Sequence, residues 1–412
     1  MRKNPNLRVT PIRGTLPLSV IRKSWPLFLG MGVLMLGAGL QSTLLGLRAT
    51  LEGFPTSVTG VIMSCYYVGY VVGTLIAPPL LRQIGHIRVF AALAAVASVA
   101  ILIQGLFVNP VTWGAMRLVS GVSFAAIYVV AESWLNDRAS RSNRGRLLAV
   151  YMVVLYVGLG AAQFLLILSD PWTPTPFMLV SVLISLAMVP IVVSAQQLPE
   201  RAGPRKVRLL DLYRDSPLGV VGVIVSGLIS SIIFSMGPVY ARLSGLDTTR
   251  VATFMAVSIL AAVATQYPVG RVSDRMDRRT VIAGVCTLTM IVAGSIVAFR
   301  NMPHAVFFTL AALFSGFALT LYSLSVSHVN DKLEPAQMVA ASSTLLLLNG
   351  AAAAIGPTLA GSLMAAFGPT AYFATLATLA AALAVYDLWR KSRRKPVPPS
   401  QKGPFIGAQP RA

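Results

Sequence analysis

Arg117 is the residue whose type and position point most directly to chemistry. It stands six positions into an apolar run that covers residues 111–133. A run of that length can cross a bilayer as a helix, which places Arg117 about 9 Å below the membrane surface. A charge at that depth is costly unless it faces a cavity or a partner, so Arg117 is a candidate functional residue. The alternative is an arginine that extends to the surface or donates to backbone carbonyls.

Acidic residues within the apolar runs are scarce, which narrows the choice of a proton carrier. Glu132 lies near the end of the run that contains Arg117, and Asp387 lies near the end of the last run. Proton coupling requires a titratable group in a partly dry site, and Glu132 is the candidate. The alternative for Glu132 is an ion pair with Arg144 or Arg146.

The composition indicates an integral membrane protein of the all-α class. Of the 412 residues, 55% are hydrophobic and only 11% are charged, whereas soluble domains are near a quarter charged. The net charge of +21 is also typical of nucleic-acid-binding proteins. The basic residues cluster in short connections and tails, however, which argues against a nucleic-acid partner. No Ser/His/Asp set, metal-binding cluster or nucleotide-binding loop suggests an enzyme, a cofactor or a metal site.

Twelve apolar runs follow one another, and each is long enough to span a membrane. They cover residues 25–47, 57–81, 89–108, 111–133, 149–169, 177–195, 217–240, 249–269, 280–299, 305–328, 338–362 and 370–389. The one long polar connection, residues 196–216, divides them into an N-terminal bundle, 25–195, and a C-terminal bundle, 217–389. Residues 1–24 form a basic N-terminal segment. Residues 390–412 form a basic tail that we expect to be disordered and attracted to anionic lipid headgroups.

The distribution of positive charge predicts the orientation. If the runs alternate across the membrane, 29 of the 34 Lys and Arg residues fall on one side and four on the other. Cytoplasmic loops carry the excess of Lys and Arg, so both termini are predicted to be cytoplasmic. No small-residue cleavage site follows the run at 25–47, which we interpret as a retained first helix. The short connections are typical of a bacterial cytoplasmic membrane protein.

A charged hairpin and an internal repeat carry a family resemblance. The hairpin reads Gly270-Arg-Val-Ser-Asp274-Arg275-Met-Asp277-Arg-Arg279, and a divergent copy, Leu81-Arg82-Gln83-Ile84-Gly85-His86, occurs about 190 residues earlier. Pro26 and Pro217, and Asn109 and Asn301, are separated by nearly the same interval. The Gly–x₃–Asp–Arg–x₂–Arg–Arg hairpin resembles the loop signature of the major facilitator superfamily of secondary transporters. The segment Glu132-Ser-Trp134-Leu-Asn136-Asp137 looks like its YcaD-like branch.

The resemblance implies two pseudo-symmetric bundles of six helices, with a substrate site between them near the middle of the membrane. The run from Arg117 through Gly121 to Ala125 is similar to a motif of proton-coupled members, and its small residues would allow close helix approach. In this family the first, fourth, seventh and tenth helices line the path. We therefore expect a pocket at a common depth, to which each bundle contributes polar side chains. The candidates are Gln41, Tyr66 or Tyr67, Arg117 and Gln163 in the first bundle, and Ser231, Ser235, Tyr322 and Asn349 in the second.

The hairpin itself is expected to act as a gate. By resemblance, Asp274, Arg275 and Arg279 form a latch that opens as the cavity opens inward, with Asp274 bonded to Arg275 or Arg279. Gly270 belongs to the same signature. In the first copy Arg82 stands where the acid is expected, which argues against two symmetric latches. The alternative is a solvated turn whose charges set the topology.

These features predict a monomeric transporter of a small organic solute, anionic or amphipathic, that works by alternating access and could couple to protons. Two alternatives remain open. One is a proton-driven exporter of hydrophobic or drug-like compounds. The other, from a different class, is a membrane sensor or scaffold that does not transport.

Overall fold

A computed structural model describes residues 18–138, 144–193, 209–299 and 302–391. Apart from short turns these residues are helical, as expected for apolar segments whose backbone groups must bond within the segment in lipid. Twelve spans among the described residues are long and apolar enough to cross a membrane, which confirms the prediction.

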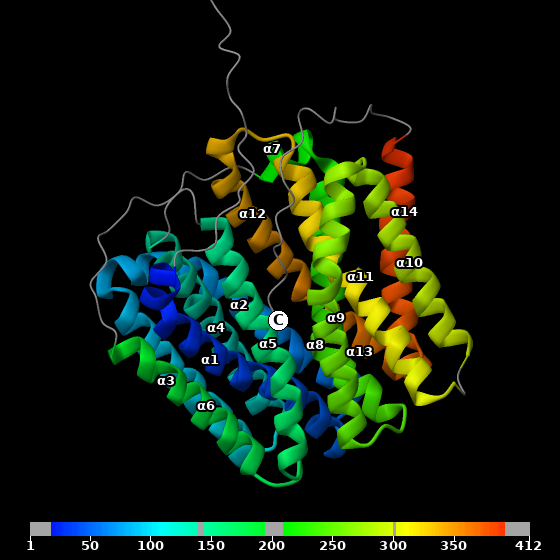
Figure 1. Ribbon diagram of the computed structural model, residues 1–412. Helices are drawn as coiled ribbons and strands as arrows, with labels where there is room; N and C mark the ends of the chain where they lie inside the picture. Colours follow the sequence, from blue (N-terminus) through cyan, green and yellow to red (C-terminus); the bar gives the residue numbers. More distant parts are fainter. Residues whose placement is uncertain (1–17, 139–143, 194–208, 300–301, 392–412) are drawn as a thin grey trace, which may run out of the picture.

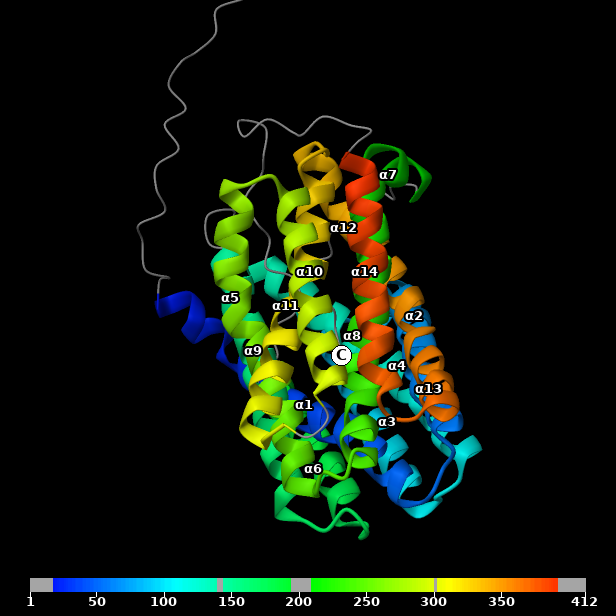
Figure 2. The ribbon, with the colours of Figure 1, turned by 90° about the vertical axis from the view of Figure 1, so that its right-hand side faces the viewer.

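The N-terminal bundle contains six long helices and a 3₁₀ turn: α1 (Leu18–Leu51), α2 (Thr56–Ile84), α3 (His86–Leu106), α4 (Pro110–Arg138), α5 (Arg144–Leu165), η1 (Leu166–Leu168) and α6 (Thr175–Val193). The remaining helices are α7 (Leu209–Asp215), α8 (Pro217–Leu243), α9 (Thr248–Arg275), α10 (Arg278–Ala298), α11 (His304–Asn330), α12 (Pro335–Ala353), α13 (Gly356–Phe367) and α14 (Ala371–Lys391). Figures 1 and 2 show α1–α6 and α8–α14 as two bundles placed side by side.

The two bundles repeat the same helix pairings. In the first bundle α2 packs on α4, α1 on α5 and α6, and α3 on α4 and α6. In the second, α9 packs on α11, α8 on α12 and α14, and α10 on α11 and α14. Each pairing recurs six spans later, so the internal repeat of the sequence corresponds to a repeat of packing.

The eleventh span is divided, although the sequence analysis predicted a continuous helix over 338–362. α12 ends at Ala353 and α13 begins at Gly356. Pro357 explains the break, because a proline has no N–H to donate to the carbonyl four residues earlier and its ring clashes with that carbonyl.

The connection between the bundles contains a short helix that was not predicted. α7 places Leu212 in a small core cluster with Val220, Tyr322 and Leu345. Lys332 Nζ, from the turn between α11 and α12, donates to the carbonyl of Asp215 at 3.0 Å. α7 is therefore attached to the C-terminal bundle.

The helix ends define two faces of the molecule. We call the end that carries the turns at Gly85, Met276 and Asp331 the basic end, after its arginines and lysines; it is uppermost in Figure 1. The opposite end carries the turns at Gly53, Gly245 and Gly368, three residues with positive φ, which glycine adopts without steric cost.

Candidate functional site

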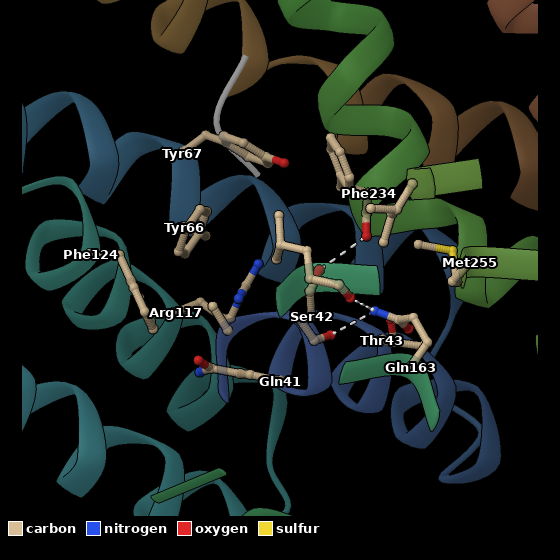
Figure 3. A pocket seen from close by; sticks show the side chains of 14 residues that line it. Gln41, Ser42, Thr43, Tyr66, Tyr67, Arg117, Phe124, Gln163, Phe234 and Met255 are labelled. Carbon is tan, nitrogen blue, oxygen red and sulfur yellow. Dashed lines mark hydrogen bonds between the residues drawn. The ribbon is translucent and has the colours of Figure 1, made fainter. Parts of the chain in front are cut away.

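A pocket lies between the two bundles (Figure 3). Arg117, one of its lining residues, stands near the start of α4, so the pocket is nearer the opposite end than the basic end. It is lined from the N-terminal bundle by α1, α2, α4 and α5, and from the C-terminal bundle by α8 and α9. The lining residues are Ala38, Gly39, Gln41, Ser42, Thr43, Tyr66, Tyr67, Arg117, Phe124, Leu159, Gln163, Phe234, Met255 and Ile259. The first-bundle candidates Gln41, Tyr66, Arg117 and Gln163 are all among them.

Glycines on α2 and α4 set the position of Arg117 relative to Tyr66. A Cβ atom built on Gly121 would overlap the carbonyl oxygen of Tyr66, and one built on Gly69 would overlap the carbonyl oxygen of Leu118. Only the absence of these Cβ atoms lets the two backbones touch, which confirms the predicted close approach at Gly121. Arg117 lies one turn before Gly121 and is thereby brought over the ring of Tyr66.

Arg117 is buried, and no carboxylate of the described residues lies within ion-pair distance of it. The residue is 3% exposed, and its guanidinium carbon lies 4.3 Å from the centre of the Tyr66 ring. Its Nε atom is buried without a hydrogen-bond acceptor. In Figure 3 the guanidinium extends from α4 toward the middle of the pocket, next to Tyr66. The charge is therefore stabilised by the face of the ring, in place of a counter-ion from the part of the chain that the structure describes.

The two glutamines of the pocket are held by bonds inside the N-terminal bundle. Gln41 Nε2 donates to Gln104 Oε1 at 3.5 Å and to Ser120 Oγ at 3.4 Å. Gln163 accepts from Thr43 at 2.7 Å and donates to the carbonyl of Leu159 at 3.0 Å. The N–H donors of both amide groups are already hydrogen-bonded within the protein. Both residues therefore form part of the pocket wall and have no amide N–H left to donate to a ligand.

The polar candidates of the C-terminal bundle do not line the pocket. Asn349 donates to the carbonyl of Val223 at 3.0 Å and so joins α12 to α8. Ser231 Oγ donates to its own helix at Leu228, and Tyr322 belongs to the small core cluster beneath α7. Ser235 Oγ, on α8, donates across the bundles to the Tyr67 hydroxyl on α2 at 3.4 Å. None of the four lines this pocket, because their side chains bond within the C-terminal bundle or, for Ser235, to Tyr67. Their place on the substrate path stays a prediction.

Glu132 lies far from the pocket. It is fifteen residues beyond Arg117 on α4, about 22 Å along the helix toward the basic end, and is half-buried. Its neighbour Ser133 has its Oγ 3.0 Å from His86 Nε2 at the start of α3. The side chains of Arg144 and Arg146, its expected partners, lie outside the described residues. Its role in proton coupling stays a prediction.

The charged hairpin forms its central ion pair through a residue that the sequence analysis did not single out. Arg278 opens α10 and is 1% exposed; its Nε lies 2.7 Å from Asp331 Oδ2 at the end of α11. Asp274, the expected acid of the latch, lies 3.5 Å from the same arginine. These bonds join the basic ends of α9, α10 and α11. No spacing in the sequence could have revealed the pair with Asp331, because the two residues lie at the ends of different helices and are 53 positions apart.

The other hairpin residues have separate positions. Arg279 pairs with Asp277 at 2.9 Å, and Asp277 also caps α10 by accepting from the Arg279 backbone N–H. Arg275 is exposed at the end of α9, Arg82 lies in the last turn of α2, and Gly270 is buried in α9.

Hydrogen bonds join the bundles on the side of the opposite end. Ser42 Oγ donates to the carbonyl of Phe234 at 3.0 Å, and Thr358 Oγ1 lies 2.8 Å from Ser64 Oγ. Gly60 packs so closely on Pro357 that a Cβ atom would collide with its carbonyl oxygen at 2.5 Å. The two bundles are therefore in direct contact at this end, between α2 and α13 and between α1 and α8.

Comparison with known proteins places this architecture in a family. The sequence model of the Major Facilitator Superfamily matches residues 27–327 and 220–410, which together cover most of the chain. The chain belongs to the major facilitator superfamily. It is 30% identical over 332 residues to an uncharacterized MFS-type transporter, YcaD, of Escherichia fergusonii, covering 79% of this chain and 84% of that protein.

Solved facilitator structures share the fold. The nucleoside transporter NupG superposes with a TM-score of 0.73 at 13% identity, covering 90% of this chain and all of NupG. A bacterial homologue of the human lysosomal transporter Spinster, in an inward-facing and unoccupied conformation, gives 0.71 at 13% identity, with coverages of 92% and 96%. At these identities the likeness establishes the fold of this facilitator. Its ligand has to be inferred from the residues that line the pocket.

Proposed function

We propose that this facilitator is a secondary transporter of a small organic anion, and that the pocket between the bundles is its binding site. The observation that carries the proposal is Arg117, a membrane-buried cation with no carboxylate of the described residues beside it. Burying a charge without a partner costs several kcal/mol, and a carboxylate on the ligand would offset that cost. Guanidinium and carboxylate groups also match in shape, because two parallel N–H donors meet two oxygens.

Alternating access gives the inter-bundle contacts a role in the transport cycle. The hydrogen bonds of Ser42 and Ser64 would break when the site opens toward the opposite end, and the basic ends of the two bundles would then meet. The basic ends would separate again when these bonds re-form. The ion pairs among Asp274, Arg278 and Asp331 hold three helices of the C-terminal bundle together, which supports its movement as a rigid unit. Asp274, Arg275 and Arg279 remain the proposed latch toward the N-terminal bundle.

Further parts of the proposal rest on sequence arguments. The charge distribution favours cytoplasmic termini. We further propose a lipid-embedded monomer in a bacterial inner membrane. Glu132 is the proposed proton-coupling carboxylate, because it is a half-buried acid on the helix that carries Arg117.

Thermal unfolding of the purified protein tests the anion site without a transport assay. A ligand that binds only the folded state raises Tm by mass action. Carboxylates are expected to raise the Tm of wild type and to leave the Tm of Arg117→Gln unchanged. Arg250→Gln is the matched control, since Arg250 is an exposed arginine at the start of α9 and should respond like wild type. Lipophilic cations that stabilise wild type and Arg117→Gln equally, with no response to carboxylates, would favour the exporter of hydrophobic compounds instead.

A further inference from the structure

The two bundles contribute different chemistry to the pocket. All of its polar side chains come from α1, α2, α4 and α5 of the N-terminal bundle. From the C-terminal bundle, α8 and α9 contribute Phe234, Met255 and Ile259, whose side chains form an apolar wall. In Figure 3 Phe234 and Met255 stand across the pocket from Arg117 and Tyr66. One side of the pocket can therefore bind charge, and the other side can only bury apolar surface.

Most side-chain donors on the polar side are already engaged, although the Tyr67 hydroxyl accepts from Ser235 and keeps its own O–H to donate. Ser42 donates to the Phe234 carbonyl, Thr43 donates to Gln163, and the amide nitrogens of Gln41 and Gln163 are engaged. Arg117 is the only charged group among the lining residues. A ligand with a second charge would find no second charged side chain in the lining to pair with, which is expensive in a buried site.

Tyr66 restricts how a ligand can approach Arg117. The guanidinium carbon lies over the ring, 4.3 Å from its centre. The edge of a guanidinium carries its N–H donors, and a planar carboxylate binds that edge with two parallel bonds. The ligand group that fits this arrangement is one carboxylate, held in the plane of the guanidinium.

We propose that the substrate is a hydrophobic monocarboxylate, with its carboxylate on Arg117 and its apolar body against Phe234, Met255 and Ile259. This inference rests on the anion site described under Proposed function and makes it specific. It excludes dicarboxylates, sugar phosphates and nucleosides as preferred ligands. It also assigns selectivity for the ligand body to the C-terminal bundle.

Dissociation constants measured by calorimetry on purified protein test the assignment. The probes are acetate, butyrate and hexanoate for the apolar body, succinate for a second charge, and hexanamide as the neutral counterpart of hexanoate. Each buried methylene contributes about 0.8 kcal/mol, so affinity should rise about fourfold per added methylene from acetate to hexanoate. Succinate and hexanamide should bind at least tenfold more weakly than hexanoate, as expected for an unpaired buried charge or a lost ion pair.

Variants of the apolar wall separate the two bundles' contributions. Met255→Ala and Ile259→Ala should each weaken hexanoate binding several-fold and leave acetate binding unchanged. Val272→Ala is the matched control, because Val272 is an exposed residue of α9 outside the pocket. Two different wall variants are used so that a folding defect in one does not decide the outcome.

The outcomes distinguish this inference from the function on which it rests. If hexanoate and succinate bind equally and Arg117→Gln abolishes both, the anion site stands and the hydrophobic monocarboxylate is rejected. Equal affinities for acetate and hexanoate would also reject it. If hexanamide binds as tightly as hexanoate to wild type and to Arg117→Gln, the anion site itself is wrong.

Discussion

Arg117 gives the pocket a charged group that can bind a ligand, and its burial costs free energy of folding. The protein buries a guanidinium group, supports it with the ring of Tyr66 and places no carboxylate of the described residues beside it. Aromatic support contributes about 0.5–2 kcal/mol, which is less than the several kcal/mol lost when a charge leaves water. Without a ligand the pocket is therefore a locally unstable arrangement that a bound anion would relieve.

Replacing Arg117 by methionine should make the ligand-free protein more stable. Methionine fills a similar volume and removes the unpaired charge, so the free energy of unfolding should rise by about 1 kcal/mol or more. The same variant should lose all stabilisation by hexanoate. Thermal unfolding with and without hexanoate measures both effects, and a lower Tm in the absence of ligand would contradict the account of an uncompensated charge.

The sequence indicated which first-bundle residues share one level, but it could not assign their bonds. Helix depth was enough to bring Gln41, Tyr66, Arg117 and Gln163 to one level, because a helix has a fixed rise per residue. The depth of a residue along its helix could not reveal that the amide groups of Gln41 and Gln163 are already hydrogen-bonded. Those bonds depend on Ser120 and Thr43, which lie on other helices. For the same reason Asn349 was expected in the pocket, whereas it bonds to α8.

At the scale of helices, the contact between α2 and α4 determines the pocket geometry. Small residues recur along this contact, with Gly69 and Gly73 on α2 meeting Leu118 and Val122 on α4. The sequence indicated this approach at Gly121, because small residues one turn apart predict close packing in membranes. The break between α12 and α13 was missed, although Pro357 was the signal for it.

Gly121→Ala should separate α2 from α4 and weaken ligand binding. The added Cβ would overlap the Tyr66 carbonyl, so the backbones must move apart, at a cost of about 1–3 kcal/mol. Tyr66 would shift relative to Arg117, and hexanoate affinity should fall as well. Gly284→Ala on α10 is the matched control, because nothing lies within 4 Å of its added methyl group. The control should be neutral or slightly stabilised through helix propensity. Equal Tm values for the two variants would refute the close-contact argument.

The whole molecule is two similar bundles held together on one side. Contacts of Ser64 with Thr358 and of Gly60 with Pro357 join α2 to α13 near the opposite end. The repeat offsets in the sequence predicted the two bundles, because duplicated segments fold alike. They did not predict on which side the bundles would touch, since this depends on the conformation and not on the periodicity of either half.

A disulfide between α2 and α13 should block transport. The hydroxyl oxygens of Ser64 and Thr358 are 2.8 Å apart, so cysteines at both positions are within bonding reach. In a background with Cys65→Ser and Cys286→Ser, oxidised Ser64→Cys/Thr358→Cys protein should bind hexanoate but show no hexanoate flux in proteoliposomes. Reduction should restore the flux, and the single-cysteine variants serve as controls. Wild-type flux in the cross-linked protein would show that this contact stays closed during transport.

The uncompensated charge of Arg117 also has an electrical consequence. A pocket without ligand carries one positive charge within the membrane, and a pocket filled by a monoanion carries none. The membrane potential acts on a charge in proportion to the part of the field it crosses, up to about 2.3 kcal/mol per 100 mV for one elementary charge. Voltage would therefore act mainly on the return of the unloaded carrier and hardly on the step that moves the substrate. For a carrier of this kind, the membrane potential would control how fast the empty binding site returns to the side where it takes up substrate.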